Sequence, residues 1–297
     1  MGEVTSSDAL KAPSDIETLS DTQLDVLERK IAAQYLKIVP WGAVVWGFGN
    51  CIAFLSLIPL AIADILPLWL GFPLATIGVI ACYLPSHEAQ HSIIASRGKP
   101  LRWLNELLGH VSTIPMVAPF RILRATHMEH HANCNDESLD PDYDVHALSD
   151  WAYLTNSLKR RFTESGNAYG ETIQRIGQGH IALDGLIYQV VFYALMIGLA
   201  WAGYALEAFF LWWLPKHLGM MYISYYLSWA PHHPAEEQGR YRDTRGFKSR
   251  LGNFMSMGMQ YHIVHHLYPR IPLSLTPAAY RDLKPILRRR GCDLGAL

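Results

Sequence analysis

The sequence predicts an all-α integral membrane protein with four transmembrane helices, interfacial helices and a polar helical cap. Three observations support this fold class. Half of the 297 residues are hydrophobic, which is ordinary for a globular protein, but they are strongly segregated along the chain. Residues 38–86 and 183–230 are almost free of charge, and each stretch could hold two membrane-crossing helices of about twenty residues. The lysines and arginines, except Lys216, lie outside both stretches.

The first residues, 1–20, are polar and acidic and lack the apolar core of a signal peptide, so we expect them to be disordered. Leu24, Leu27, Ile31 and Leu36 follow at helical spacing, which predicts a short amphipathic helix lying on the membrane. We expect residues 21–297 to form a single membrane-embedded domain.

Each apolar stretch divides at a charged residue, Asp64 in the first and Glu207 in the second. The triplet Pro215-Lys216-His217 would be costly among lipid tails, so we expect it near the outer interface or buried in protein. The four spans are expected at residues 41–62, 66–86, 183–204 and 208–229.

Residues 100–124 are apolar at helical spacing from Leu101 onwards, but the stretch from Val111 to Phe120 is too short to cross a bilayer. We expect an interfacial or re-entrant helix pair here. With four spans, both termini and residues 87–180 and 230–297 share one side of the membrane. Because this side carries nearly all of the positive charge, we expect both termini and this cap to be cytoplasmic.

Composition excludes several classes of protein. A net charge of −1 and only short basic clusters give no support for nucleic-acid binding. The four cysteines form no CxxC pair, so the sequence contains neither a disulfide framework nor a zinc ribbon.

Histidines are concentrated in short boxes at the ends of the apolar stretches: HEAQH, HMEHH and HIVHH, with a PHHP segment before the last. Residues three or four apart lie on one face of a helix, so each box presents its imidazoles toward a common centre. In PHHP we favour His232 over His233 because it follows Pro231 at the end of the last span. The nine candidate metal ligands are His87, His91, His127, His130, His131, His232, His262, His265 and His266.

Nine imidazoles are too many for one ion of four to six positions and suit two ions side by side. Imidazole also binds zinc, copper and nickel, but a closed structural zinc site usually includes thiolate. Two iron ions (Fe2+/Fe3+) would have four or five imidazoles each, with a position left for O2.

Charged residues near the boxes are candidates for supporting roles. Carboxylates commonly accept the second N–H of metal-bound histidines, although helix caps and surface turns explain such residues equally well. Arg240, Arg242 and Arg245 could contact a lipid head group or an electron donor, or only anionic lipid. The candidate carboxylates are Glu88, Glu129, Asp140, Asp142 and Asp144. Aromatic residues that could line a substrate tunnel, or form interfacial belts, are Trp41, Trp46, Trp69, Trp212, Trp213, Tyr222, Tyr225 and Tyr226.

With these boxes in this order, the chain resembles the membrane fatty acid desaturase/hydroxylase superfamily over roughly residues 40–285. The segments APHHP, RYRDTR and YHIVHHLYPRIP, with DPD after the second box, are similar to the bacterial β-carotene ketolase-like branch. Two features depart from other branches. Acyl-CoA Δ9 desaturases have four residues between the first pair of histidines where this chain has three, and several lipid desaturases have Gln in place of His262.

The resemblance implies a membrane stem with a cap enclosing two irons, and O2-dependent desaturation or hydroxylation of a long-chain fatty acyl lipid. A carotenoid ketolase or hydroxylase and a terminal-alkene-forming fatty acid decarboxylase remain alternatives on the same ligands. The sequence has no HPGG signature of a fused cytochrome b5, so we expect a separate ferredoxin, rubredoxin or cytochrome as electron donor. A metal transporter would place its ligands near the bilayer midplane, whereas these boxes lie at the ends of spans.

Overall fold

The computed structural model describes residues 16–162 and 167–297, and every regular element in these ranges is helical. The α-helices are α1 (Asp21–Ala33), α2 (Trp41–Ile62), α3 (Leu68–Gln90), α4 (Arg102–Ser112), α5 (Phe120–Asn133), α6 (Asp150–Phe162), α7 (Ala168–Arg175), α8 (Ala182–Trp201), α9 (Ala205–Ala208), α10 (Leu214–Ser224), α11 (Gly252–Met255), α12 (His262–Leu267) and α13 (Thr276–Arg289). Short 3-10 turns occur at Ile16–Thr18, Tyr143–Val145, Gly179–Ile181, Met259–Tyr261 and Leu273–Leu275, and π-helical turns at Phe209–Trp213 and Tyr225–Trp229.

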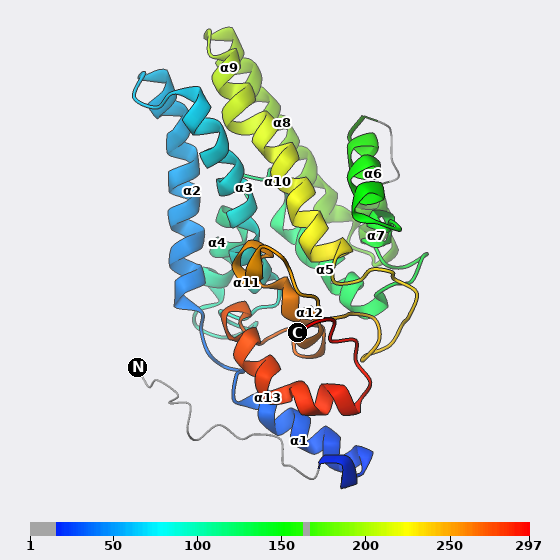
Figure 1. The fold of residues 1–297 in the computed structure, drawn as a ribbon. Helices are drawn as coiled ribbons and strands as arrows, with labels where there is room; N and C mark the ends of the chain where they lie inside the picture. The colour runs from blue at the N-terminus through cyan, green and yellow to red at the C-terminus, as the bar shows by residue number, and fades with distance from the viewer. Residues whose placement is uncertain (1–15, 163–166) are drawn as a thin grey trace.

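Three helices in the described residues are long and apolar enough to cross a membrane: α2, α3 and the helix Gly179–Trp201, which includes α8. The fourth predicted span lies in a run of α9, a π turn, α10 and a second π turn, which follow one another without a break beside α8 (Figure 1). That this run crosses the membrane remains a prediction. The turn that precedes this run is centred on Gly203, which has φ 95°, whereas the sequence predicts the division at Glu207.

The sequence suggested that the N-terminal helix lies on the membrane through its apolar side, but in the structure this side is buried within the protein. Leu24 and Ile31 are fully buried in a cluster with Leu283 and Ile286 of α13. Both helices are amphipathic, so each covers the apolar side of the other.

The residues that precede α1 differ in part from the expected disorder. Residues 1–15 lie outside the described ranges, but Ile16–Thr18 forms a 3-10 turn. Ser20 then begins α1 as a capping box, in which its side chain accepts from the Gln23 N–H and the Gln23 side chain accepts from the Ser20 N–H.

The expected interfacial helix pair is only half correct. Helix α4 is present, but residues 113–119 form turns in place of a second apolar helix. Pro115 and Pro119 lack the N–H that a helix interior needs, and Val117 has φ 54°. Helix α5 begins directly after Pro119, and Gly109 of α4 allows close contact with it, because a Cβ there would lie 2.3 Å from the Phe120 ring.

These elements bring four distant parts of the chain together at one end of the long helices (Figure 1). They are the last turn of α3, the C-terminal half of α5, the segment that follows the second π turn, and α12. Helices α1 and α13 pack beneath them at the same end, so the histidine boxes are enclosed between the long helices and this smaller layer.

Candidate metal centre

The nine predicted histidines converge from these four segments, and seven of them lie in two neighbouring groups. In the first group, one ligand atom from each of His87, His91, His127 and His265 lies within 4.8 Å of the others. In the second, the same holds for His130, Cys134, His232 and His266. The two remaining histidines border these groups, since His131 Nε2 lies 3.1 Å from His265 Nε2 and the His262 ring centroid lies 4.6 Å from that of His266.

The nitrogens that face one another are the Nε2 atoms of different boxes. His91 and His127 approach to 2.8 Å, and His130 and His232 to 3.2 Å. Both nitrogens of His87 and of His262 are buried without a hydrogen-bond partner among the described residues. Buried polar atoms normally have partners, so unsatisfied imidazole nitrogens directed at a common centre fit metal ions as the missing partners.

The protonation state of the site also suits metal binding. Burial is the largest cause that lowers the pKa of His91, His127 and His265 well below the usual histidine value, and neighbouring imidazoles lower it further. Burial likewise lowers the pKa of His232 to about 3. These rings are therefore neutral near pH 7, the form that donates a lone pair to a metal.

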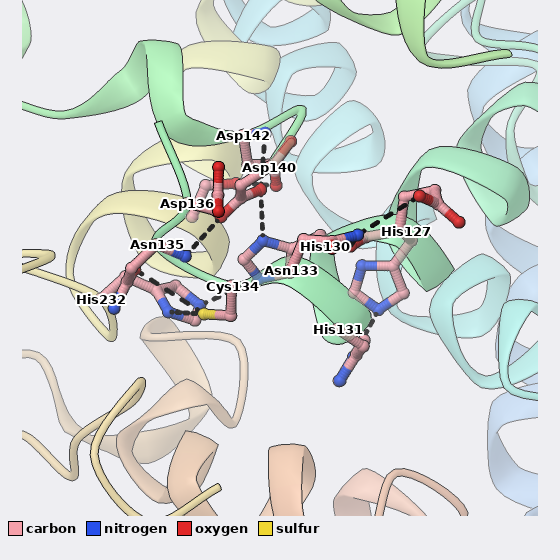
Figure 2. A network of polar contacts seen from close by, with 12 residues as sticks. His127, His130, His131, Asn133, Cys134, Asn135, Asp136, Asp140, Asp142 and His232 are labelled. Atoms are coloured by element: carbon pink, nitrogen blue, oxygen red, sulfur yellow. Dashed lines mark hydrogen bonds and ion pairs between the residues drawn. The ribbon is translucent and has the colours of Figure 1, made fainter. Parts of the chain in front are cut away.

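His130 is held by a buried carboxylate. Its Nδ1 lies 2.8 Å from Asp140 Oδ1, and both side chains are almost fully buried (Figure 2). Burial opposes charge on both groups, but their mutual attraction and hydrogen bond dominate, raising the pKa of His130 and lowering that of Asp140. Because the carboxylate accepts the proton of Nδ1, the Nε2 lone pair is directed toward the centre.

His232 is held in a similar way by backbone and sulfur. Its Nδ1 lies 3.1 Å from the Asp243 carbonyl oxygen and 3.2 Å from Cys134 Sγ. Since a carbonyl only accepts, Nδ1 carries the hydrogen and Nε2 is free to bind a metal. The turn that carries His232 is fastened by Arg245, whose Nε donates to the Ala230 carbonyl at 3.1 Å.

Asn135 connects the two groups that hold these histidines, the Asp140 carboxylate and the Asp243 carbonyl (Figure 2). Its backbone N–H donates to Asp140 Oδ2 at 2.9 Å, and its side-chain amide donates to the Asp243 carbonyl at 2.9 Å. The residue is buried and has φ 64°, a conformation that Asn tolerates better than most residues. Neither Cys134 nor Asn135 was predicted from the sequence. The signal for Cys134 was its spacing of four residues from His130, although α5 ends at Asn133, directly before it.

The other predicted carboxylates do not contact a box histidine through any hydrogen bond seen in the described residues. Glu88 accepts from the Leu273 N–H at 2.8 Å, which fastens the end of α3. Glu129 lies 3.4 Å from Arg175, on the outer side of α5. Asp142 accepts from the hydroxyl groups of two cavity residues, described below, and Asp144 lines the same cavity.

The remaining polar candidates lie at the edge of the site. Arg240 pairs with the buried Glu28, and Arg242 lies 3.7 Å from Glu237; both arginines are more than half exposed. His233 stacks on Trp229, outside both histidine groups.

A cavity of about 450 Å³ lies beside the centre. None of the eight aromatic residues considered as tunnel lining contributes to its wall, which instead contains Tyr83, Tyr153 and Tyr169. Some of the eight are exposed, such as Trp69 at 77%, whereas Trp212 is buried and donates its Nε1–H to the Pro115 carbonyl.

Comparison with known proteins is consistent with this arrangement. The family model described as "Fatty acid desaturase" matches residues 63–294. The chain is 34% identical over 89 residues to an sn-1 acyl-lipid omega-3 desaturase (ferredoxin) of Nostoc sp., covering 27% of this chain and 24% of that protein. It is 26% identical over 136 residues to an sn-1 oleoyl-lipid 12-desaturase of Synechocystis sp., covering 46% and 34%.

A longer match is to the omega-3 fatty acid desaturase, endoplasmic reticulum, of Nicotiana tabacum, with 24% identity over 266 residues, 77% of this chain and 69% of that protein. The two cyanobacterial matches cover only about a quarter to a third of those relatives' lengths. The three relatives are all named as lipid or fatty acid desaturases. The similarity to the ketolase-like branch, expected from the sequence, remains a prediction.

Proposed function

Since this chain belongs to the fatty acid desaturase family and is an oxidoreductase, we propose that it is an O2-dependent non-haem diiron oxidase that desaturates a long-chain fatty acyl lipid at the membrane. The observation that carries the proposal is the convergence of nine predicted histidine ligands, seven of them in two neighbouring groups, with buried nitrogens that lack protein partners. The names of the relatives, all desaturases, support desaturation over hydroxylation or ketolation.

The histidines would hold two iron ions, the first with His87, His91, His127 and His265 and the second with His130, His232 and His266, with His131 and His262 beside them. When bound, iron supplies the redox chemistry that couples O2 reduction to removal of hydrogen from an unactivated carbon. The protein's own part is to keep these imidazoles neutral and oriented, and to hold the acyl chain where the reaction occurs.

The proposed reaction removes one hydrogen from each of two adjacent carbons and forms a C=C bond between them. O2, two electrons and two protons are consumed, and two waters are formed. The electrons come from a separate carrier; ferredoxin in the name of the Nostoc relative supports a ferredoxin-type donor, with rubredoxin or a cytochrome as the alternative. We further propose that the run Ala205–Trp229 is a fourth span and that the boxes and both termini are cytoplasmic, which the distribution of positive charge supports.

Lipid analysis of cells that express the protein tests the proposed reaction. We expect a lipid product that is two mass units lighter and about two irons per purified chain, and we expect His130→Ala to abolish both. His180→Ala, which changes an exposed histidine outside the boxes, should have no effect. A gain of sixteen mass units would instead indicate hydroxylation. Unchanged products with His130→Ala would refute the diiron proposal.

A further inference from the structure

The cavity beside the centre reaches the first histidine group. Its wall includes Tyr83 and Leu123, which lie four residues, about one helical turn, before His87 and His127 respectively. The ring centroid of Tyr83 lies 5.8 Å from that of His87. An occupant of the cavity would therefore lie beside the ligands, with little protein between them.

The outer wall of the cavity is α6, which exposes large apolar side chains. Trp151 is 72% exposed, and Leu154 and Leu158 are also exposed, whereas Tyr153 is buried on the inner side. The inner side also carries Ser157 and Arg160, which line the cavity. Large apolar side chains exposed on one side of a helix are typical of an interfacial helix that contacts lipid.

Helix α6 is fastened in this orientation by Tyr153. This buried side chain donates to the Met221 carbonyl at 2.8 Å and packs against the Trp229 ring, at a centroid distance of 5.7 Å. Both partners belong to α10 and the π turn that leads to His232, so the outer wall and a candidate ligand share one support.

The lining of the cavity is amphiphilic. Met116, Leu123, Met220, Ile223 and Leu227 provide an apolar side. Arg160 is the only cation among the described lining residues. It donates to Ser157 Oγ of its own helix at 3.4 Å and forms no ion pair with a described residue.

The two carboxylates of the lining differ from each other. Asp142 accepts from Tyr169 Oη and from Ser228 Oγ, both at 2.8 Å, so its oxygens already have partners in the wall. Asp144 is the other carboxylate, and it comes from the same loop. Arg160 forms no ion pair with either carboxylate, so an entirely hydrocarbon occupant would leave its guanidinium without paired acceptors, which is unfavourable in a partly dehydrated site.

We propose that this cavity binds an amphiphile, with one long hydrocarbon chain of the amphiphile along the apolar side and its anionic head group paired with Arg160. That the amphiphile is the substrate rests on the proposed function. A guanidinium binds a fatty acid carboxylate and a phospholipid phosphate by the same paired hydrogen bonds, so either could supply the anion. A carotenoid, which has no anionic group, does not meet this requirement.

Photo-crosslinking of the full chain in phosphatidylcholine nanodiscs tests the site without requiring iron or turnover. One probe is oleic acid with a diazirine in its chain, and the second is a phosphatidic acid with the same labelled chain. Labelled peptides are mapped by mass spectrometry in the wild type, Arg160→Gln and Arg160→Lys. Arg250→Gln, which changes an exposed cation that does not line the cavity, is the matched control.

We expect labelling of peptides that contain Leu123 and Met220–Ser228, and a decrease of about tenfold in Arg160→Gln. Arg160→Lys should reverse this decrease only in part, because it keeps the charge but not the paired hydrogen bonds. Whichever probe shows this dependence identifies the carboxylate or the phosphate as the anion. The proposal is overturned if Arg160→Gln labels these peptides like the wild type, or if both probes label only the exposed face of α8. The same measurement on His130→Ala separates this result from the diiron proposal, because labelling should persist there even if iron is lost.

Discussion

Asp140→Asn tests how far the buried carboxylate determines iron binding. The two oxygens of Asp140 accept from three donors: the Nδ1–H of His130 at 2.8 Å and the backbone N–H groups of Asn135 and Asp142, each at 2.9 Å. The side chain of Asn has nearly the same shape, but it is neutral and has a donor in place of one oxygen. At least one of the three donors then faces an NH2 group.

The expected loss of iron affinity in Asp140→Asn follows from two independent estimates. A hydrogen bond to a charged group contributes roughly 1.5–3 kcal/mol. Loss of the carboxylate that supports a metal-bound histidine weakens metal binding about 10- to 100-fold, which is about 1.4–2.8 kcal/mol. We therefore expect the iron affinity of Asp140→Asn to fall by one to two orders of magnitude, because the His130 ring loses both its orientation and its preferred tautomer.

The assay is a titration of the metal-free protein with buffered Fe2+, with bound iron measured by mass spectrometry. Asp136→Asn is the matched control, since Asp136 lies in the same loop, accepts from Ser138 and Leu139, and forms no hydrogen bond with a box histidine. If Asp140→Asn binds iron within about twofold of both the wild type and this control, the inferred role of Asp140 is wrong.

Three further predictions follow from the same contacts. Both Asn135→Gly and Asn135→Ala should weaken iron binding, because each loses the amide that donates to the Asp243 carbonyl, but only Ala should add about 1 kcal/mol of instability at φ 64°, measured by chemical unfolding. Gly109→Ala should destabilise the fold by about 1–3 kcal/mol through contact with Phe120, whereas Gly198→Ala, which meets open space, should not; equal melting temperatures would contradict this. Free Fe2+ at 100 times its dissociation constant should stabilise the chelator-treated protein by about 2.7 kcal/mol for each ion bound, seen as a higher melting temperature that a chelator reverses.

The linear pattern of the chain was sufficient for its first two long apolar helices. The expected span at residues 41–62 coincides with α2, and the span expected at residues 66–86 is α3, which begins at Leu68 and continues through His87 to Gln90. Errors arose where tertiary contacts compete with a local pattern. The apolar side of α1 is covered by α13 and not by lipid, and two prolines prevent a second helix after α4.

The candidate site depends both on residue spacing in the sequence and on the packing of the helices. Spacings of three and four residues place the histidines of each box on one helical face, so candidate ligands could be named from the sequence alone. Which boxes share a group could not be read from spacing, because it depends on how the helices pack. His130 and His232, for example, are separated by 102 positions and come within 3.2 Å only in the folded chain.

The identity of the chemistry, an imidazole-rich centre at the ends of apolar helices, was thus encoded locally, since residue type and helical periodicity need no partner segment. The supports of that centre were decided by tertiary structure. The contact of Asn135 with the Asp243 carbonyl, and the cavity that places Arg160 near Met220 and Leu227, exist only when distant segments meet. Such contacts depend on the crossing of helices and on turns such as the π turn before His232, and no short-range sequence pattern specifies these.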